Sequence, residues 1–280
     1  MSATPRPGLL LLLVAFGNAE EVNDFISHVR ATCQAPISFA VCDNTPGGSG
    51  PITSDADCIV TARPDNPGYL EGALHALRAF QSQRPTPEWI AITNTDLTFR
   101  RGDLLTVLSR YDSDVPVVIG PRITEGVDAQ EMNPHVVTPR GLGRLRLNHW
   151  TTATPVLAYG YLGLHGAKFA VTRSRRTRTG ASSPDPRHLT PSDMFSPYGA
   201  MMFFSRAFMT HVGLPPKVPL FAEEYAVAET ARRAGARVRY EPDIHVNHDS
   251  NSTTGPRLSW RRAKALTVAF RYIYDFARTP

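Results

Sequence analysis

The sequence has few cysteines and no long apolar run. Its three cysteines are scattered over 280 residues, at Cys33, Cys42 and Cys58, without the spacing of a metal site. An odd, sparse set of thiols is typical of a reducing compartment rather than of a disulfide framework, so we expect a cytoplasmic protein. No segment approaches the ~20 consecutive apolar residues that a membrane-spanning helix needs. The sequence therefore predicts no transmembrane segment.

Signatures of nucleic-acid recognition are also missing. The chain has a net charge of +5 and a sequence pI near 9.3, which permits nucleic acid, anionic lipid or a phosphorylated substrate as partner. No zinc-finger or RNA-binding motif is present, which argues against nucleic acid. A signal peptide would have a longer apolar core than the run 9–16, which leads directly into a polar loop. We interpret this run as the first strand.

Apolar strands and amphipathic helices alternate through the first 120 residues. Strands are expected at 9–16, 37–42, 58–61, 89–93 and 117–120. One helix between them carries the stripe Val22, Phe25, Ile26 and Val29, another carries Leu70, Leu74 and Leu77, and a third begins near Asp103. This alternation predicts right-handed crossovers and an α/β fold with a mostly parallel sheet.

Polar residues mark the expected starts of the first two helices. Asn18 is predicted to cap the first helix, with Glu21 as its capping-box partner. Asn66 is predicted to cap the second helix, with Pro67 at the first helical position.

The second half of the chain is less regular. Segment 121–195 is rich in proline and glycine, has an arginine cluster at 173–178, and could form a helix within 151–171. A segment this long with weak periodicity is usually functional or mobile. Regular structure is expected again in the following ranges: a strand at 198–204, a helix from Phe221 to Gly235, short strands at 238–240 and 244–246, and a helix at 258–277.

Asn94, Thr95 and Asp96 directly follow the apolar run Trp89–Ile92. Ligands of open α/β sheets bind beyond the carboxyl ends of the strands. Two oxygen-bearing side chains two residues apart suit a hard divalent ion such as Mg²⁺, which takes few protein ligands. The same three residue types also form ordinary turns, so both interpretations stay open at this point.

Other polar residues have equally divided interpretations. Asp43 follows the second strand, where an acid can meet the ribose or base of a nucleotide or simply form a turn. Asn66 and Gly68 could let the backbone approach a nucleotide closely or could only start a helix. His248 could bind a metal or phosphate, although a lone histidine is more often structural.

The pair Glu223-Glu224 follows the apolar residues Leu220-Phe221. One of the two carboxylates could act as a general base toward a substrate hydroxyl. Alternatively, both acids could only stabilise the first turn of a helix through its dipole.

Taken together and in this order, short motifs resemble the inverting nucleotide-sugar glycosyltransferases of the GT-A (Rossmann-like) fold, in particular bacterial rhamnosyltransferase-like and cell-surface polysaccharide enzymes. The resemblance spans residues 10 to about 252 and rests on these pieces: Val14-Ala15-Phe16-Gly17-Asn18, Val41-Cys42-Asp43-Asn44, Asn66-Pro67-Gly68-Tyr69, Asn94-Thr95-Asp96, Tyr198-Gly199-Ala200, Phe221-Ala222-Glu223-Glu224 and Asn247-His248-Asp249-Ser250.

The resemblance implies a role for each of these positions. Asn94-Thr95-Asp96 stands for the Asp-x-Asp metal motif, so Asp96 would bind Mg²⁺ or Mn²⁺. Beyond the resemblance, we expect His248 to add a contact to the metal or to the diphosphate. Glu224 matches the base position, beside Glu223, and Gly199 and Ala200 would line the acceptor side. The residues expected to bind a UDP-, dTDP- or GDP-sugar donor are Phe16, Asn18, Asp43, Asn44, Asn66, Gly68, Asn94 and Thr95.

Two positions depart from the family pattern. Asn94 replaces the first acid of the metal motif, so Asp96 would carry most of the metal binding. The base is often Asp in the family, and Glu224 is one methylene longer.

The expected organisation is a GT-A domain at 1–256, with a donor half at 1–120 and an acceptor half at 121–256, followed by a basic amphipathic helix at 257–280. The helix carries the stripe Leu266, Phe270, Ile273 and Ala277. That stripe could lie on the inner face of the plasma membrane, pack on the chain's own sheet, or form a homodimer interface. The acceptor would be a glycan or a lipid-linked glycan.

Two alternatives to a glycosyltransferase stay open. A sugar nucleotidyltransferase would need a glycine-rich, basic phosphate loop after the first strand, and residues 17–21, Gly-Asn-Ala-Glu-Glu, do not provide one. A catalytically silent nucleotide-sugar-binding protein of the same fold is the other alternative, because Asn94 removes one acid from the metal motif.

Overall fold

A computed structural model describes residues 8–33, 36–100, 104–126, 129–164, 188–249 and 258–279. The elements in chain order are β1 (Leu9–Ala15), α1 (Ala19–Thr32), β2 (Ile37–Asp43), β3 (Cys58–Ala62), α2 (Tyr69–Gln81), β4 (Trp89–Thr93), β5 (Leu97–Phe99), α3 (Leu104–Leu108), β6 (Val117–Glu125), β7 (Gln130–Glu131), α4 (Leu142–Thr151), β8 (Ser192–Asp193), β9 (Met201–Ser205), the π-helical turn η2 (Phe208–Val212), α6 (Glu223–Arg233), β10 (Arg237–His248) and α7 (Trp260–Arg278).

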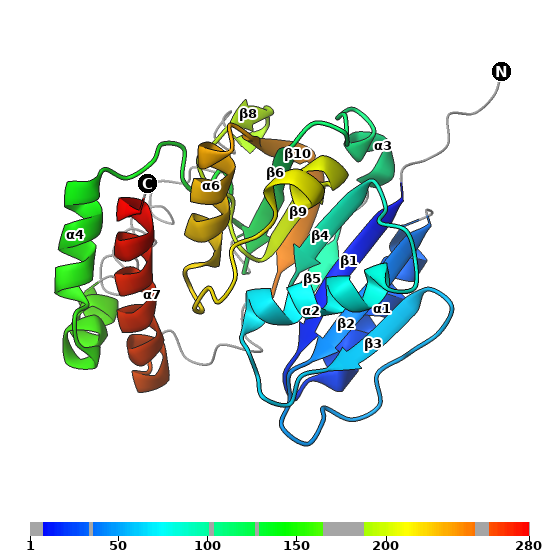
Figure 1. The fold of residues 1–280 in the computed structure, drawn as a ribbon, viewed down its shortest axis with the longest axis horizontal. Coiled ribbons are helices and arrows are strands. Elements are labelled where there is room, and N and C mark those ends of the chain that lie inside the picture. Colours follow the sequence, from blue (N-terminus) through cyan, green and yellow to red (C-terminus); the bar gives the residue numbers. More distant parts are fainter. Residues whose placement is uncertain are drawn as a thin grey trace.

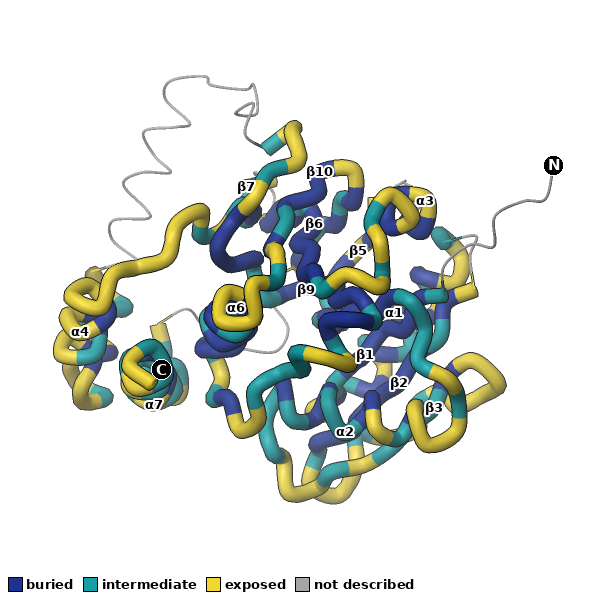
Figure 2. The backbone as a smooth tube through the Cα atoms, turned by 45° about the horizontal axis from the view of Figure 1, so that its top comes forward, coloured by how far each residue is buried: buried dark blue, intermediate teal, exposed yellow. Residues whose placement is uncertain are grey.

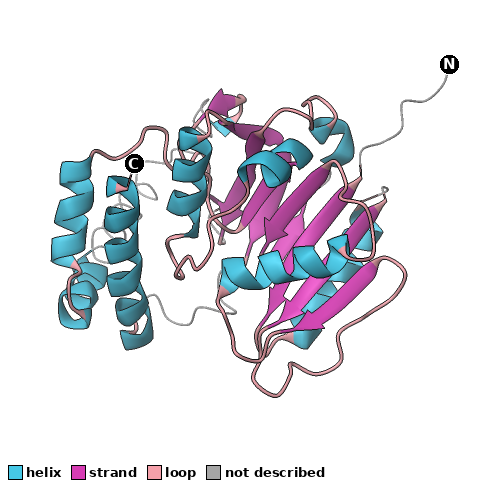
Figure 3. Cartoon of the chain, viewed as in Figure 1, coloured by secondary structure: helices cyan, strands magenta, loops and turns pink. Residues whose placement is uncertain are grey.

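One twisted sheet forms the centre of the molecule, with helices on both faces (Figure 3). Its strand order is β3-β2-β1-β4-β9-β6-β10-β5. Strands β1 to β4 are parallel to one another, and β6 and β10 run in the same direction, while β9 lies antiparallel between β4 and β6. The expected α/β fold with a mostly parallel sheet is therefore confirmed.

The leucine run of β1 is buried from both sides of this sheet. Leu9, Leu11 and Leu13 face a core formed with α1 and α3. Leu10 and Leu12 face a second core formed with α2, α6 and α7. A strand covered on both faces has no polar side, which explains its unbroken apolar sequence. Each fully buried leucine stabilises the fold by about 1.5–3 kcal/mol.

The predicted caps of the first two helices are wrong in detail. Asn18 occupies the N-cap position of α1, but its side chain makes no capping hydrogen bond. Its Oδ1 instead accepts from the Phe16 N–H at 2.8 Å, and its Nδ2 donates to Glu21 Oε1 at 2.9 Å. Helix α2 begins at Tyr69, because its N-cap Gly68 has a non-helical backbone with φ 100°. Asn66 lies before this point in a left-handed conformation with φ 44°.

The second half contains more regular structure than its sequence predicts. Strand β6 continues to Glu125, and α4 lies inside the segment that was expected to be irregular. The two short strands expected near the end are one strand, β10, with an irregularity between Glu241 and His245. Pro242 lies there and has no N–H to donate to the ladder. Residues 155–164 are helical, within the predicted range 151–171. The arginine cluster at 173–178 lies outside the described residues.

Helices α4 and α7 lie side by side at the edge of the molecule that is farthest from β3 (Figures 1 and 2). The predicted stripe of α7 turns inward, since Ile273 is buried and Phe270 and Ala277 pack with it on the second core. Of the possibilities stated for this stripe, the structure shows packing within the chain, mainly against the helices α4 and α6 rather than on the sheet. No helix in the described part of the chain is both long and apolar enough to cross a bilayer.

Candidate active site

The predicted donor and acceptor residues come together where β1 and β4 end and the antiparallel strand β9 begins. Asn18 Nδ2 donates to Thr95 Oγ1 at 3.3 Å, and Thr95 Oγ1 donates in turn to Glu21. The Asn94 N–H donates to the Ala200 carbonyl at 2.8 Å. The turn that carries Asp96 is therefore held from both halves of the domain.

Asp43 organises the loop that follows β2. Its carboxylate accepts hydrogen bonds from the N–H groups of Thr45 and Ser49, at 3.0 and 2.7 Å, and from the Ser49 hydroxyl at 2.6 Å. Burial acts to raise the pKa of the Asp43 carboxyl, but these hydrogen bonds outweigh it and hold the pKa below its ordinary value. Asp43 is therefore an ionised acceptor fixed in position, and its contact with a nucleotide stays a prediction.

Asn44 joins the end of β2 to the start of α2. Its side chain is 2% exposed, and its Nδ2 donates to the Gly68 carbonyl at 3.0 Å. The Asn66 N–H donates to the Arg63 carbonyl at 2.9 Å in the preceding turn. These contacts hold the predicted donor residues Asn44, Asn66 and Gly68 in one place, whereas the Phe16 side chain remains 44% exposed at the sheet edge.

Asp96 and His248 form a close, buried pair. The distance from Asp96 Oδ1 to His248 Nε2 is 3.2 Å, and the two side chains are only 9% and 8% exposed. Strand pairing places them, because His248 lies opposite Leu97 in the antiparallel pair β10–β5. The Asp249 N–H also donates to the Asp96 carbonyl at 3.0 Å. His248 Nδ1 has no hydrogen-bond partner among the described residues.

Glu223 and Glu224 begin α6 but differ in environment. Glu224 is half-buried, and its Oε1 accepts from the Gly199 N–H at 3.2 Å. Glu223 is buried, and no described group bonds its Oε1. Burial, followed by the negative charge of Glu224, raises the pKa of Glu223 to about 8. Glu224 is therefore the more accessible of the two carboxylates.

Gly199 is required for this close approach. A Cβ atom at position 199 would lie 2.8 Å from Glu224 Cγ and Oε1. The sequence indicated an acceptor role for Gly199 and Ala200, and the structure places Gly199 against the predicted base. Any larger residue at position 199 would displace the Glu224 side chain.

Three aromatic residues at the site were not assigned from the sequence. The Tyr198 ring lies between His135 and His248, with centroid distances of 5.5 and 5.9 Å. The Tyr69 hydroxyl is buried without a hydrogen-bond partner in the described part of the chain. Burial raises the pKa of Tyr69 well above its ordinary value, and the charges of Glu223, Asp96 and Glu224 add to the shift. Tyr69 is therefore close enough to Glu223, Glu224 and Asp96 for their charges to affect its pKa.

The sequence held a partial signal for two of these residues. Tyr69 and Tyr198 are part of the motifs that carry the family resemblance, but they had no role of their own. His135 lies in the segment of weak periodicity, where nothing local distinguishes it.

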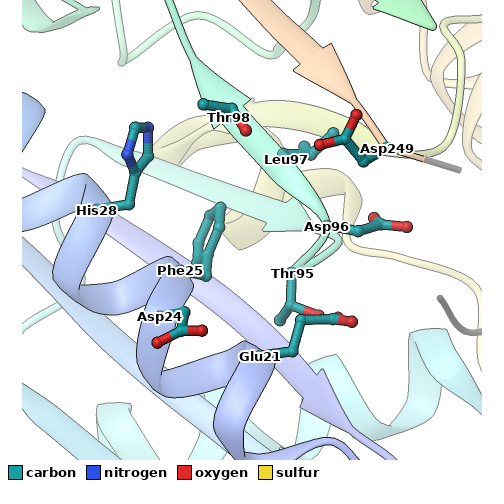
Figure 4. Close-up of a pocket in the computed structure, with 9 residues that line it drawn as sticks. All are labelled: Glu21, Asp24, Phe25, His28, Thr95, Asp96, Leu97, Thr98 and Asp249. Carbon is teal, nitrogen blue, oxygen red and sulfur yellow. The ribbon is translucent and has the colours of Figure 1, made fainter. Parts of the chain in front are cut away.

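A cleft of about 520 Å³ lies between α1 and β5, beside the Asp96 turn (Figure 4). Its lining comprises Glu21, Asp24, Phe25, His28, residues 95–98 and Asp249. His28 is engaged, since its Nε2 accepts from the Phe99 N–H at 3.0 Å. The cleft contains Thr95 and Asp96 but neither acid of α6. It therefore flanks the candidate site and does not form its centre.

No protein-family model matches this sequence, and no curated protein matches it. Among solved structures, the chain is similar to the crystal structure of GalNAc-T7 with UDP, GalNAc and Mn²⁺, with 8% identity and a TM-score of 0.55 over 91% of this chain and 46% of that chain. It is also similar to the mannosyltransferase PcManGT from Pyrobaculum calidifontis in complex with GDP-Man and Mn²⁺, with 13% identity and a TM-score of 0.53 over 99% of this chain and 66% of that chain.

This chain spans about half of the first of these proteins and just under two thirds of the second. At such low identity, the similarity shows the fold alone. The fold is that of the GT-A glycosyltransferases, as the sequence resemblance predicted.

Proposed function

We propose that this protein is a metal-dependent inverting glycosyltransferase that transfers a sugar from a nucleoside-diphosphate donor to an acceptor hydroxyl. One observation carries the proposal. The buried Asp96–His248 pair and the reachable carboxylate of Glu224 lie around the same two tyrosines, Tyr69 and Tyr198. This arrangement supports a metal-binding group and a base that act at the same end of the sheet.

The residues fit a divalent cation. Asp96 Oδ1 and His248 Nε2 lie 3.2 Å apart and would supply two ligands. The described residues contain no group of three or more histidine, cysteine, aspartate or glutamate side chains that could hold a metal, so the remaining ligands would come from the substrate and water. Mg²⁺ commonly takes one or two protein carboxylates and completes its shell with substrate phosphates and water. When bound by Asp96 and His248, the ion would act as a Lewis acid that neutralises the diphosphate leaving group.

Glu224 would perform the proton transfer. Its carboxylate removes the proton of the acceptor hydroxyl while the hydroxyl oxygen bonds to the anomeric carbon. The bond between that carbon and the diphosphate oxygen breaks, and the diphosphate leaves with the electron pair. A single displacement of this kind inverts the anomeric configuration. The Gly199 N–H, at 3.2 Å from Glu224 Oε1, would hold the base in position.

The other predicted residues would bind the donor. Asp43 offers an ionised carboxylate at the end of β2, and Phe16 offers an exposed ring at the end of β1. The resemblance further favours a bacterial enzyme of the rhamnosyltransferase-like or cell-surface polysaccharide type, acting on a glycan or a lipid-linked glycan.

A thermal-shift screen of UDP-, dTDP- and GDP-sugars with Mn²⁺ tests the proposal. A donor at ~100-fold excess over its Kd stabilises by about 2.7 kcal/mol, which raises the Tm of a domain this size by roughly 5–10 °C. Release of nucleoside diphosphate should follow with the same donor. If no nucleotide sugar stabilises the protein with either Mn²⁺ or Mg²⁺, the proposal is wrong. Stabilisation without turnover would instead favour a silent binding protein.

A further inference from the structure

Several large apolar side chains are exposed on α4, on the helical residues 155–164 and on α7. Ten of the fifteen exposed large hydrophobic residues in the described part of the chain belong to these helices or to Leu258 just before α7. Single exposed apolar residues are ordinary on protein surfaces, whereas a concentration of them on neighbouring helices points to an interaction site. The outer helical face is defined here by six residues that are each 50–75% exposed: Leu147, Trp150, Val156, Leu157, Leu164 and Val268.

The fold does not use these side chains for its own packing. Leu145 and Asn148 fix the inward side of α4, and Ala158 does so for residues 155–164. Ring contacts close the interior between these helices, with His149 stacked on Tyr274 at 5.5 Å. With 100° between successive helical positions, Leu147 and Trp150 point away from Leu145. The outer helical face is therefore left for a partner.

The charge of these helices identifies the kind of partner. Residues 140–164 and 258–279 contain eight lysines and arginines against one acid, Asp275, a net +7 on a chain whose total is +5. The rest of the chain is therefore slightly negative. Arg144 and Arg146 are exposed beside Leu147, and Lys264 and Arg271 are exposed beside Val268. Two copies of this face would repel each other, whereas an anionic surface would attract it.

We propose that the outer helical face docks this protein on an anionic lipid bilayer. The apolar side chains would enter the boundary between headgroups and acyl chains, and the surrounding arginines and lysines would contact the lipid phosphates. Trp150 and Trp260, which are 66% and 46% exposed, suit this interfacial depth. The stripe of α7 that the sequence suggested for this purpose turns inward, so the docking residues are a different set. The proposal does not depend on the catalytic function.

Co-sedimentation of the full chain with phosphatidylcholine vesicles, with and without phosphatidylglycerol, tests the proposal at ~0.15 M salt. We expect binding only when the anionic lipid is present, and weaker binding as salt is raised. Tryptophan emission gives a second readout, because Trp89, the third tryptophan of the chain, is buried at 1% exposure. A blue shift on vesicle addition would therefore report Trp150 and Trp260.

Test and control substitutions distinguish lipid binding by the outer helical face from non-specific lipid binding by the rest of the protein. Each basic side chain near an anionic surface strengthens binding roughly fivefold, so Arg144→Gln with Arg146→Gln should weaken it roughly 30-fold. Trp150→Ser should weaken it roughly tenfold. The matched controls are Arg100→Gln and Val115→Ser, two exposed positions on either side of α3, and both should bind like the unchanged protein.

Three outcomes would overturn the proposal. The first is no binding to phosphatidylglycerol vesicles, and the second is equal loss of binding in the test and control variants. The third is a dimer in sedimentation velocity that Trp150→Ser abolishes while no vesicle binding occurs, which would assign the face to a second copy of the chain.

Discussion

Replacing Glu224 with glutamine tests the proposed base directly. Glutamine keeps the size of the side chain and an oxygen that can accept from the Gly199 N–H, at 3.2 Å in the structure, but it cannot take a proton. A positioned general base contributes roughly 10²- to 10⁴-fold to rate, or about 3–5 kcal/mol of activation free energy. We expect kcat to fall by that factor. Donor affinity should hardly change, because the proposed role of Glu224 is toward the acceptor hydroxyl and not toward the donor.

Glu223→Gln is the matched control for this variant. Burial and the charge of Glu224 raise the pKa of Glu223 to about 8, so its carboxyl is mostly protonated at neutral pH. Glutamine imitates that neutral form and should retain most of the activity. The two variants also share one helix turn, so a general effect on α6 would appear in both.

The assay has two readouts for each variant. Release of nucleoside diphosphate from the donor found in the thermal-shift screen gives turnover, and titration of the same donor by thermal shift gives affinity. An active Glu224→Gln beside an inactive Glu223→Gln would show that the two roles are reversed. Equal loss of turnover in both variants would refute the assignment of a single base.

Three further predictions concern neighbouring residues. The pKa of Glu223 is about 8 in the folded protein against an ordinary value of 4.5, so only the folded state holds this proton between those pH values. The free energy of unfolding should therefore fall by slightly more than 1 kcal/mol for each pH unit of increase in that range. In Glu223→Gln, the free energy of unfolding obtained from urea titrations should depend less steeply on pH. Asp96→Asn should abolish turnover and the Mn²⁺-dependent part of donor stabilisation, and full activity of this variant in EDTA would contradict the metal site. Gly199→Ala should reduce kcat, because its Cβ would lie 2.8 Å from the Glu224 side chain and would displace it; unchanged kcat would show that the Glu224 position is not critical.

Buried strands were the most predictable part of this fold. The bounds of β4 agree with the expected range 89–93, and β1 differs by one residue at its end. Both strands are covered on two faces, so burial alone determines their composition. Helix α4 was missed because it turns only Leu145 and Asn148 fully inward and otherwise exposes both apolar and basic residues. The apolar residues of α4 therefore do not repeat every 3.6 positions, and the sequence pattern does not predict a helix there.

The site was predictable where residues follow strands and was not where they meet through tertiary packing. The family resemblance predicts a metal role for Asp96, whereas His248 is only a candidate for metal or diphosphate from its residue type; the register of β5 against β10 brings the two within 3.2 Å. The sequence does not predict which of the adjacent residues Glu223 and Glu224 is buried, because both are glutamates. It arises because the start of α6 buries one side chain and presents the other to Gly199.

The two proposals meet in helix α7. Near its start, Arg262 lies over the ring of Phe221, two residues before Glu223, at 5.0 Å. Near its end, Phe276 lies under Arg233, the last residue of α6, at 4.6 Å. These contacts fix the helix that carries the candidate base to the helical layer that carries the outer face. If that layer docks on a bilayer, the contacts between α6 and α7 also set the orientation of Glu224 relative to the membrane.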